Sequence, residues 1–161
     1  MDASRIQHAC GAALETNQGI VATSGLREGD EALGAPMTKH TGPVLVVDDD
    51  EAVRHSLKFV LELEGLDVRL YEDGAGLLRD AALPHMGCLV VDYWMPDMDG
   101  FQLVGRLRDR NVDLPAILIT ARPSFDLQRR AADAGFRRVV EKPFEDSSLL
   151  DGIHDALAAS A

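Results

Sequence analysis

The sequence predicts an α/β fold in which repeated strand–helix units build a parallel sheet. From Pro43 onward, five short apolar runs alternate with stretches of helical periodicity, which is the pattern of such units. The first, third and fourth runs are almost continuously apolar, as is typical of strands that helices cover on both faces. At 161 residues, the chain is long enough for one such domain and a tail but too short for two substantial domains.

The elements are expected in strict alternation along the chain. The second apolar run mixes polar and apolar residues and fits an edge strand. In the first helix Val53, Leu57 and Leu61 share one face, and Gly65 is expected to end it. The strands are expected at 44–48, 67–71, 88–92, 116–120 and 137–140, and the helices at 50–64, 74–82, 100–110, 124–134 and 147–159.

Residues 1–42 differ in composition from the rest of the chain. They are rich in small and polar residues and keep neither helical nor strand periodicity for long. We therefore expect a largely disordered N-terminal extension before a domain at 43–161. Ile6, Cys10 and Leu14 recur at four-residue spacing, so a short helix or a docking segment within 5–15 stays open. Met37 also leaves open a natural start at that position.

The charge and hydropathy of the chain exclude several classes of function. A net charge of -11 argues against a surface that neutralises phosphates, so direct binding to nucleic acid is not expected. The sequence contains no apolar run long enough to cross a bilayer and no secretory signal pattern. We therefore expect a cytoplasmic protein without membrane insertion.

Polar residues collect where the predicted strands end. An acidic triplet at 48–50 ends the first run, Asp92 ends the third, Thr120 ends the fourth, and Lys142 follows the fifth. The carboxyl ends of parallel strands meet at one edge of the sheet, where doubly wound proteins bind their ligands. Each residue alone is ordinary, because acids cap helices and turns favour such residues. Their combination at one edge favours a functional site.

The chemistry of this set indicates a metal ion and a phosphoryl group. Several carboxylates close together repel, and a hard cation such as Mg²⁺ or Mn²⁺ relieves the repulsion while leaving room for water or phosphate. A carboxylate such as Asp92 can attack a phosphoryl group and form an acyl phosphate if the transferring oxygens are stabilised. Lys142 and Thr120 supply an ammonium and a hydroxyl for that purpose.

Four segments carry a resemblance to a known family. The stretches VLVVDDDEAVRHSL, VVDYWMPDMDG, AILITA and VVEKPFED resemble the motifs of response-regulator receiver domains in two-component signalling, and are most similar to the FixJ-like branch. The resemblance runs from about residue 43 to the C-terminus. It implies a flavodoxin-like, doubly wound parallel sheet of five strands in order 2-1-3-4-5 with five helices, and no prosthetic group besides a divalent ion.

The resemblance also implies roles in metal binding. Asp92 is the implied phosphorylation site and a metal ligand, and Asp49 is the other direct carboxylate ligand. Asp48 is implied to act mainly through water, and Trp94 to offer its backbone carbonyl. Asp50 is then outside the site, near the start of the first helix.

Further implied features concern the phosphoryl group and the switch. Thr120 and Lys142 are implied to contact the phosphoryl oxygens, and the bond before Pro143 to be cis. The family usually carries an aromatic residue three positions before the lysine, where this sequence has Val139. Phosphorylation is therefore expected to reach the surface through backbone and fourth-helix movement.

The implied partners are a sensor histidine kinase or a histidine phosphotransfer protein, and an unknown downstream protein. A homodimer through the fourth helix and fifth strand is also compatible with the resemblance. We expect no enzymatic activity besides self-catalysed phosphoryl transfer and autodephosphorylation. Three alternatives stay open: the receiver part of a truncated DNA-binding transcription factor, a scaffold with an inactive site, and a metal-dependent phosphatase. The phosphatase is disfavoured because Trp94 stands where such enzymes have a second Asp.

Overall fold

A computed structural model describes residues 42–144 and 147–160. The N-terminal extension expected at 1–42 falls outside this range except for Gly42, so its predicted disorder stays a prediction. No helix in the described part of the chain is long and apolar enough to cross a membrane.

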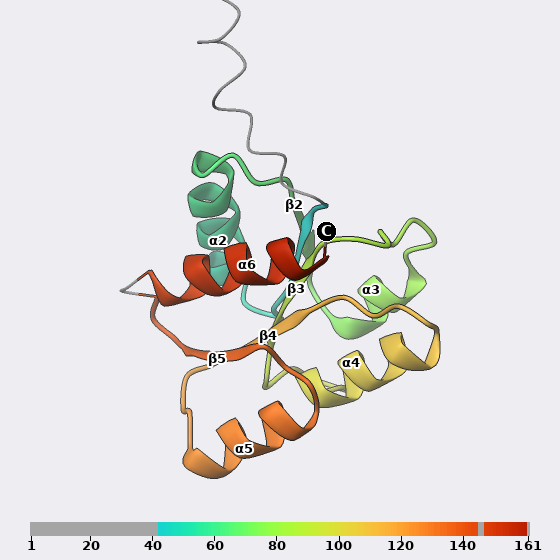
Figure 1. Cartoon of the computed structure of the whole chain (residues 1–161), viewed down its shortest axis with the longest axis vertical. Coiled ribbons are helices and arrows are strands. Elements are labelled where there is room, and N and C mark those ends of the chain that lie inside the picture. The colour runs from blue at the N-terminus through green and yellow to red at the C-terminus, as the bar shows by residue number, and fades with distance from the viewer. Residues whose placement is uncertain (1–41, 145–146, 161) are drawn as a thin grey trace, which may run out of the picture. The chain divides into compact units, whose positions relative to one another are not determined.

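Five parallel strands form a single sheet in the order β2-β1-β3-β4-β5 (Figure 1), which confirms the predicted fold class. The central strands β1, β3 and β4 are buried along their whole length, and the polar second strand lies at an edge as expected. The strands are β1 (Val44–Val47), β2 (Val68–Tyr71), β3 (Cys88–Asp92), β4 (Ala116–Thr120) and β5 (Arg138–Glu141).

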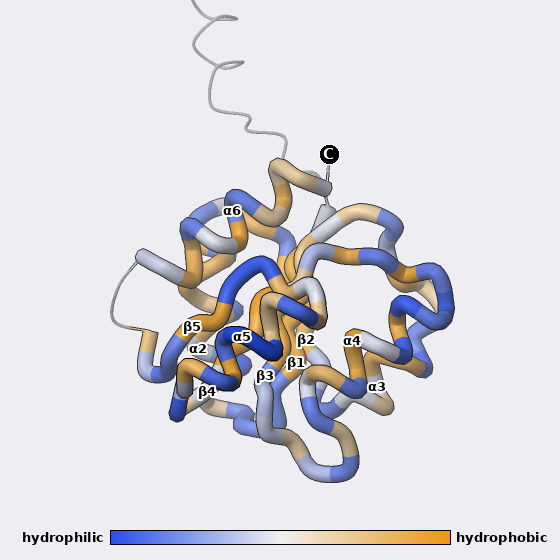
Figure 2. Tube along the Cα trace, turned by 60° about the horizontal axis from the view of Figure 1, so that its bottom comes forward, coloured by the Kyte–Doolittle hydropathy of each residue, from blue (hydrophilic) through white to orange (hydrophobic). Residues whose placement is uncertain are grey.

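Helices cover both faces of the sheet (Figure 1). The helices are α2 (Glu51–Leu63), α3 (Gly74–Arg79), α4 (Gly100–Asp109), α5 (Phe125–Asp133) and α6 (Ser148–Ser160). Helices α2 and α6 pack on the face that carries Val44 and Val46, whereas α3, α4 and α5 pack on the face that carries Leu45 and Val47. Alternate residues of each strand thus enter two separate cores. In Figure 2 the strands form the apolar centre and polar residues mark the outer sides of the helices.

Side-chain caps begin four of the helices. Asp50, Asp73, Asp99 and Ser124 each accept a hydrogen bond from a backbone N–H in the first turn of the helix that follows. These bonds satisfy amides that have no partner within the helix. After α2, Gly65 takes a φ of 80°, which confirms the predicted end of that helix.

The second predicted helix, expected at 74–82, is shorter than predicted. Helix α3 ends at Arg79 and not at residue 82. Asp80 has extended backbone angles, and its carboxylate accepts hydrogen bonds from the Tyr71 hydroxyl at 2.6 Å and from the Ala82 amide at 2.8 Å. This side chain competes with the helix for the backbone amides. All other predicted boundaries agree with the structure to within one residue.

Candidate functional site

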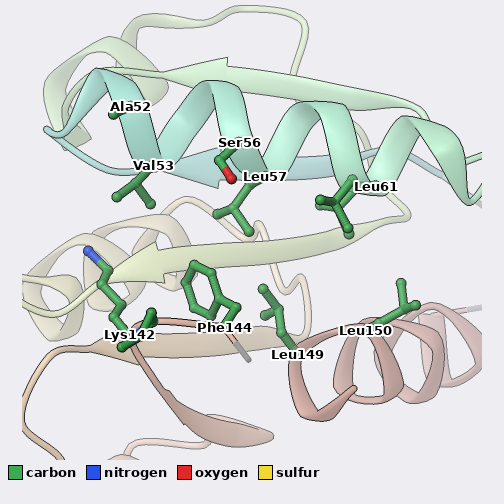
Figure 3. A pocket seen from close by; sticks show the side chains of 11 residues that line it. Ala52, Val53, Ser56, Leu57, Leu61, Lys142, Phe144, Leu149 and Leu150 are labelled. Carbon is green, nitrogen blue, oxygen red and sulfur yellow. The ribbon is translucent and has the colours of Figure 1, made fainter. Parts of the chain in front are cut away.

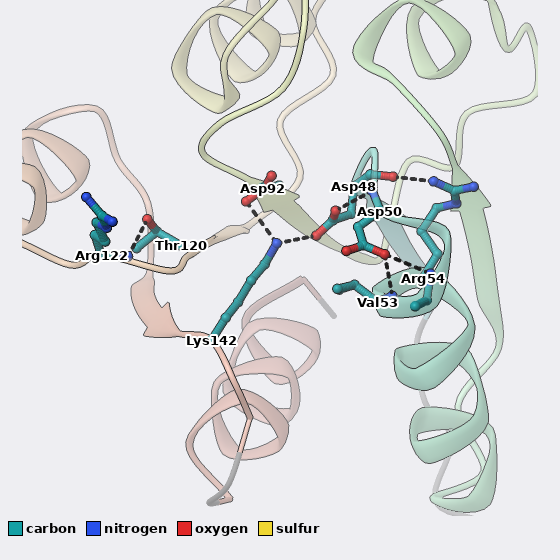
Figure 4. A network of polar contacts seen from close by, with 9 residues as sticks. Asp48, Asp50, Val53, Arg54, Asp92, Thr120, Arg122 and Lys142 are labelled. Carbon is teal, nitrogen blue, oxygen red and sulfur yellow. Dashed lines mark hydrogen bonds and ion pairs between the residues drawn. The ribbon is translucent and has the colours of Figure 1, made fainter.

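The polar residues expected at the carboxyl edge of the sheet are found there (Figure 4). Asp48 follows β1, Asp92 ends β3, Thr120 ends β4 and Lys142 follows β5. Strand β3 lies between β1 and β4, so Asp92 occupies the centre of the edge. The chain turns in opposite directions from β1 and from β3, so the strand order reverses between these two neighbouring strands. Doubly wound sheets bind their ligands at such a point.

Lys142 joins two buried carboxylates. Its ammonium lies 2.6 Å from Oδ2 of Asp48 and 3.2 Å from Oδ1 of Asp92. Asp48 is fully buried, and its other carboxylate oxygen accepts a hydrogen bond from the Asp50 amide at 2.9 Å. The bond between Lys142 and Pro143 is cis, as the resemblance implied. The structure therefore brings together three of the predicted site residues from three different strands.

Burial and charge change the acid–base behaviour of this group. Burial, followed by the negative charge of Asp48, raises the pKa of Asp92 to about 6, although Lys142 acts in the opposite direction. Burial alone would lower the pKa of Lys142, but its hydrogen bonds and charge contacts with Asp48 and Asp92 outweigh that effect and raise it. The carboxylates therefore carry more negative charge than the single ammonium compensates.

Three carboxylates form a group that fits a metal ion. Oxygens of Asp48, Asp49 and Asp92 lie within 4.8 Å of one another. Asp49 is exposed whereas the other two are buried, so the group opens to solvent on one side. An all-oxygen donor set with an open side suits Mg²⁺, which prefers carboxylates and retains water ligands. The residues present therefore fit a divalent cation.

The remaining predicted site residues have distinct surroundings. Thr120 is buried, and its hydroxyl accepts a hydrogen bond from the Arg122 amide at 3.3 Å. The Trp94 side chain is 77% exposed. Its backbone carbonyl as a ligand stays a prediction. Asp50 caps α2 by accepting hydrogen bonds from the amides of Ala52 and Val53, so it lies at the helix start as expected. Its place outside the site stays a prediction.

Sequence reasoning missed two residues that contact the site. Arg54 in the first turns of α2 donates a hydrogen bond from Nη1 to the backbone carbonyl of Asp48 at 2.7 Å (Figure 4). Gly100 begins α4 so close to β3 that a Cβ there would lie 2.9 Å from the carbonyl oxygen of Asp92. The sequence did offer a signal for Arg54, because this arginine follows the acidic triplet by about one helical turn.

An apolar groove of about 680 Å³ adjoins the site. It runs between α2 and the start of α6, with Lys142 at one end (Figure 3). The apolar residues that line it include Val53, Leu57, Leu61, Phe144 and Leu149. A molecule that approaches Asp92 from this side would meet an apolar surface.

On the opposite face, three aromatic residues pack against one another and against α5. Val139, at the position where the resemblance leads us to expect an aromatic residue, is partly buried against the core on this face. Phe101 packs edge-on against Tyr93 and Phe136, with ring centroids 5.7 and 5.3 Å apart, and the Arg130 guanidinium lies 5.0 Å from the centre of the Phe101 ring. These contacts link the residue after Asp92 to α5.

Four arginines, Arg129, Arg130, Arg137 and Arg138, lie in or beside α5 and β5, but they do not share one face. Arg138 points to the other face of the sheet, where it donates a hydrogen bond to the Ser148 carbonyl at 3.1 Å and lies 3.5 Å from Asp155 of α6. The reason is the two-residue period of a strand, which places Arg138 on the same side as Val140 and opposite Val139.

Fold and site together define a doubly wound α/β protein with a buried carboxylate–ammonium centre at the carboxyl edge of its sheet. Comparison with known families gives the same class in more specific terms, because residues 44–154 match the response regulator receiver domain. The chain belongs to this family, the receiver domains of two-component response regulators.

Individual relatives support this assignment. The chain is 38% identical over 120 residues to the transcriptional regulatory protein FixJ of Rhizobium meliloti, a match that covers 74% of this chain and 58% of FixJ. It is 40% identical over 107 residues to the response regulator MprA of Mycobacterium ulcerans, covering 66% of this chain and 46% of MprA. The chain thus spans about half the length of the curated relatives it matches.

Solved structures show the same likeness. The crystal structure of FixJ-N superimposes with a TM-score of 0.66 at 36% identity, covering 72% of this chain and 93% of that one. The receiver domain of the Francisella response regulator 1452 superimposes with a TM-score of 0.68 at 27% identity, covering 74% and 100% of the two chains.

Proposed function

We propose that Asp92 accepts a phosphoryl group from a histidine kinase or a histidine phosphotransfer protein, and that the phosphorylated domain changes its protein contacts in the cytoplasm. The observation that carries this proposal is the position of Asp92. It is a buried carboxylate at the centre of the sheet edge, 3.2 Å from the Lys142 ammonium and beside the acidic pair Asp48 and Asp49.

In the proposed transfer, an oxygen of Asp92 attacks the phosphorus atom of a phosphohistidine. The phosphorus–nitrogen bond breaks and its electron pair stays on the imidazole, which takes up a proton. Lys142 neutralises charge on the transferring oxygens, and Thr120 donates a hydrogen bond to them once its hydroxyl turns from Arg122. Asp49 and Asp92 would hold Mg²⁺ directly with the Trp94 carbonyl, and Asp48 through water. The bound ion supplies further neutralisation of charge on the phosphoryl oxygens.

Intact-mass measurement tests this proposal. Incubation of the protein with acetyl phosphate and Mg²⁺ is expected to add one phosphoryl group per chain, and Asp92→Asn is expected to remove the gain. The exposed Asp97→Asn serves as a matched control in the same loop and should leave the gain unchanged. A chain that gains no mass, or an Asp92→Asn variant that gains as much as the parent, would contradict the proposal.

We further propose that phosphorylation acts on the surface formed by α5 and β5, as an interface with a downstream protein or a second copy. In support, β5 is an edge strand and Phe125 at the start of α5 is 84% exposed. The solution mass with and without beryllofluoride tests this interface. An unchanged mass, together with unchanged amide exchange in α5, would refute it.

A second candidate function is that of a receiver part within a longer DNA-binding regulator. It is favoured by the relatives named transcriptional regulatory proteins, which the chain covers over 58% or less of their length. The test is the coding sequence beyond residue 161. A downstream helix-turn-helix region supports this candidate, and a stop codon at that point refutes it.

A further inference from the structure

We infer that Arg54 is a positioning residue for the acidic pair, because it fixes the peptide unit that carries both carboxylates. This inference rests on the proposed function of the site as a metal and phosphoryl centre. Arg54 lies in α2, whereas the carboxylates lie in the turn between β1 and that helix. The Arg54 side chain turns back over this turn to reach the Asp48 carbonyl (Figure 4).

The Asp48 carbonyl lies where the sheet no longer provides a partner. Pairing between β1 and β2 ends at Val47 and Tyr71, and the last bond runs from the Asp48 amide to the Tyr71 carbonyl at 3.3 Å. Asp48 is nevertheless 0% exposed. A buried carbonyl without a donor is costly. The bond of 2.7 Å from Arg54 therefore satisfies a carbonyl that water does not reach.

This bond completes the set of contacts around Asp48. The Asp48 carboxylate accepts from the Asp50 amide and the Lys142 ammonium, its amide donates to Tyr71, and its carbonyl accepts from Arg54. The same carbonyl belongs to the peptide bond that leads into Asp49. A donor on this peptide therefore limits rotation of the backbone on both sides, and orients both carboxylates toward Asp92.

A positioning role and a purely electrostatic role predict opposite results. Removing the positive charge of Arg54 leaves the acidic group more negative, which by itself strengthens its attraction for Mg²⁺. Loss of the orienting bond acts in the other direction, since partners that orient metal ligands typically contribute about 10- to 100-fold to metal affinity. The sign of the change in Mg²⁺ affinity therefore separates the two roles.

The experiment is a Mg²⁺ titration followed by the fluorescence of Trp94, the only tryptophan in the sequence and two residues from Asp92. Arg54→Met is expected to weaken Mg²⁺ binding by about 10-fold or more. Arg54→Gln keeps a donor without the charge, and Arg54→Lys keeps both a donor and the charge. Both are expected to recover part of the affinity.

Lys58→Met is the matched control, since it removes a cation one turn further along α2 whose partner is the exposed Glu62 at 2.7 Å. It should leave Mg²⁺ affinity unchanged. Thermal unfolding without Mg²⁺ checks that each variant is folded, and the Gln and Lys variants carry the test if Arg54→Met does not fold. Unchanged or tighter Mg²⁺ binding in a folded Arg54→Met overturns the inference while the proposed function stands, and so does Mg²⁺ binding in Arg54→Gln that is tighter than in the parent protein. A parent protein that neither binds Mg²⁺ nor takes up a phosphoryl group overturns the proposed function, and this inference with it.

Discussion

Replacement of Asp92 by asparagine is expected to stabilise the metal-free protein at neutral pH. Burial and the nearby charge of Asp48 raise the pKa of Asp92 from 3.8 to about 6 in the folded state. The folded state therefore binds this proton more tightly than the unfolded chain does. As the pH rises from about 4 through about 6, the folded state loses stability relative to the unfolded chain, and above pH 6 the loss is complete.

The size of the effect follows from the two pKa values. Each unit between them corresponds to about 1.4 kcal/mol, so ionised Asp92 costs the folded state up to roughly 3 kcal/mol above pH 6. Asparagine has a similar shape and carries no charge, and the contact of the ionised carboxylate with Lys142 at 3.2 Å is already contained in the raised pKa. The expected gain is therefore up to roughly 3 kcal/mol, which for a domain of this size raises Tm by roughly 10 °C.

The assay is thermal unfolding in a buffer with a chelator, at pH 8 and at pH 4. Asp92→Asn should have the higher Tm at pH 8, and the difference should disappear at pH 4, where the parent carboxyl is protonated. Asp49→Asn is the control, and its shift should be smaller because Asp49 is exposed. Equal Tm values at pH 8, or a difference that persists at pH 4, would refute the reasoning.

Three other changes test the energetics of the fold and site. Lys142→Met removes the cation that lies between two buried carboxylates and should lower the free energy of unfolding in metal-free urea titrations by about 3–5 kcal/mol; a loss below about 1 kcal/mol contradicts this. Leu103→Ala deletes a fully buried side chain and should lower the free energy of unfolding by about 2–5 kcal/mol. Leu63 is 71% exposed, so Leu63→Ala should change it by no more than about 0.5 kcal/mol. Similar losses in both variants would show that burial does not decide the cost. Asp50→Ala removes the cap of α2 and should lower the free energy of unfolding by about 1 kcal/mol while Mg²⁺ affinity stays unchanged. If Asp50→Ala weakened Mg²⁺ binding as much as Asp49→Asn does, Asp50 would be identified as a ligand.

Local patterns in the sequence were sufficient to predict most of the fold. Apolar runs and helical periodicity arise from neighbouring residues, so the strands and helices could be predicted to within one residue at nearly every end. The exception is the end of α3, where the Asp80 carboxylate bonds to a tyrosine nine residues away and to the Ala82 amide. A residue that caps a turn in one context extends a helix in another, and only its partners decide which occurs.

The sequence by itself determined which residues stand at the carboxyl edge of the sheet, because in a parallel sheet every strand ends on the same side. It also identified the acidic residues, the threonine and the lysine as one group. Only the tertiary structure decided that Lys142 bridges Asp48, 94 positions away, and Asp92, and that Arg54 turns back to the Asp48 carbonyl. The physical reason is that such contacts depend on strand register, side-chain rotamers and the exclusion of water, which no local pattern encodes.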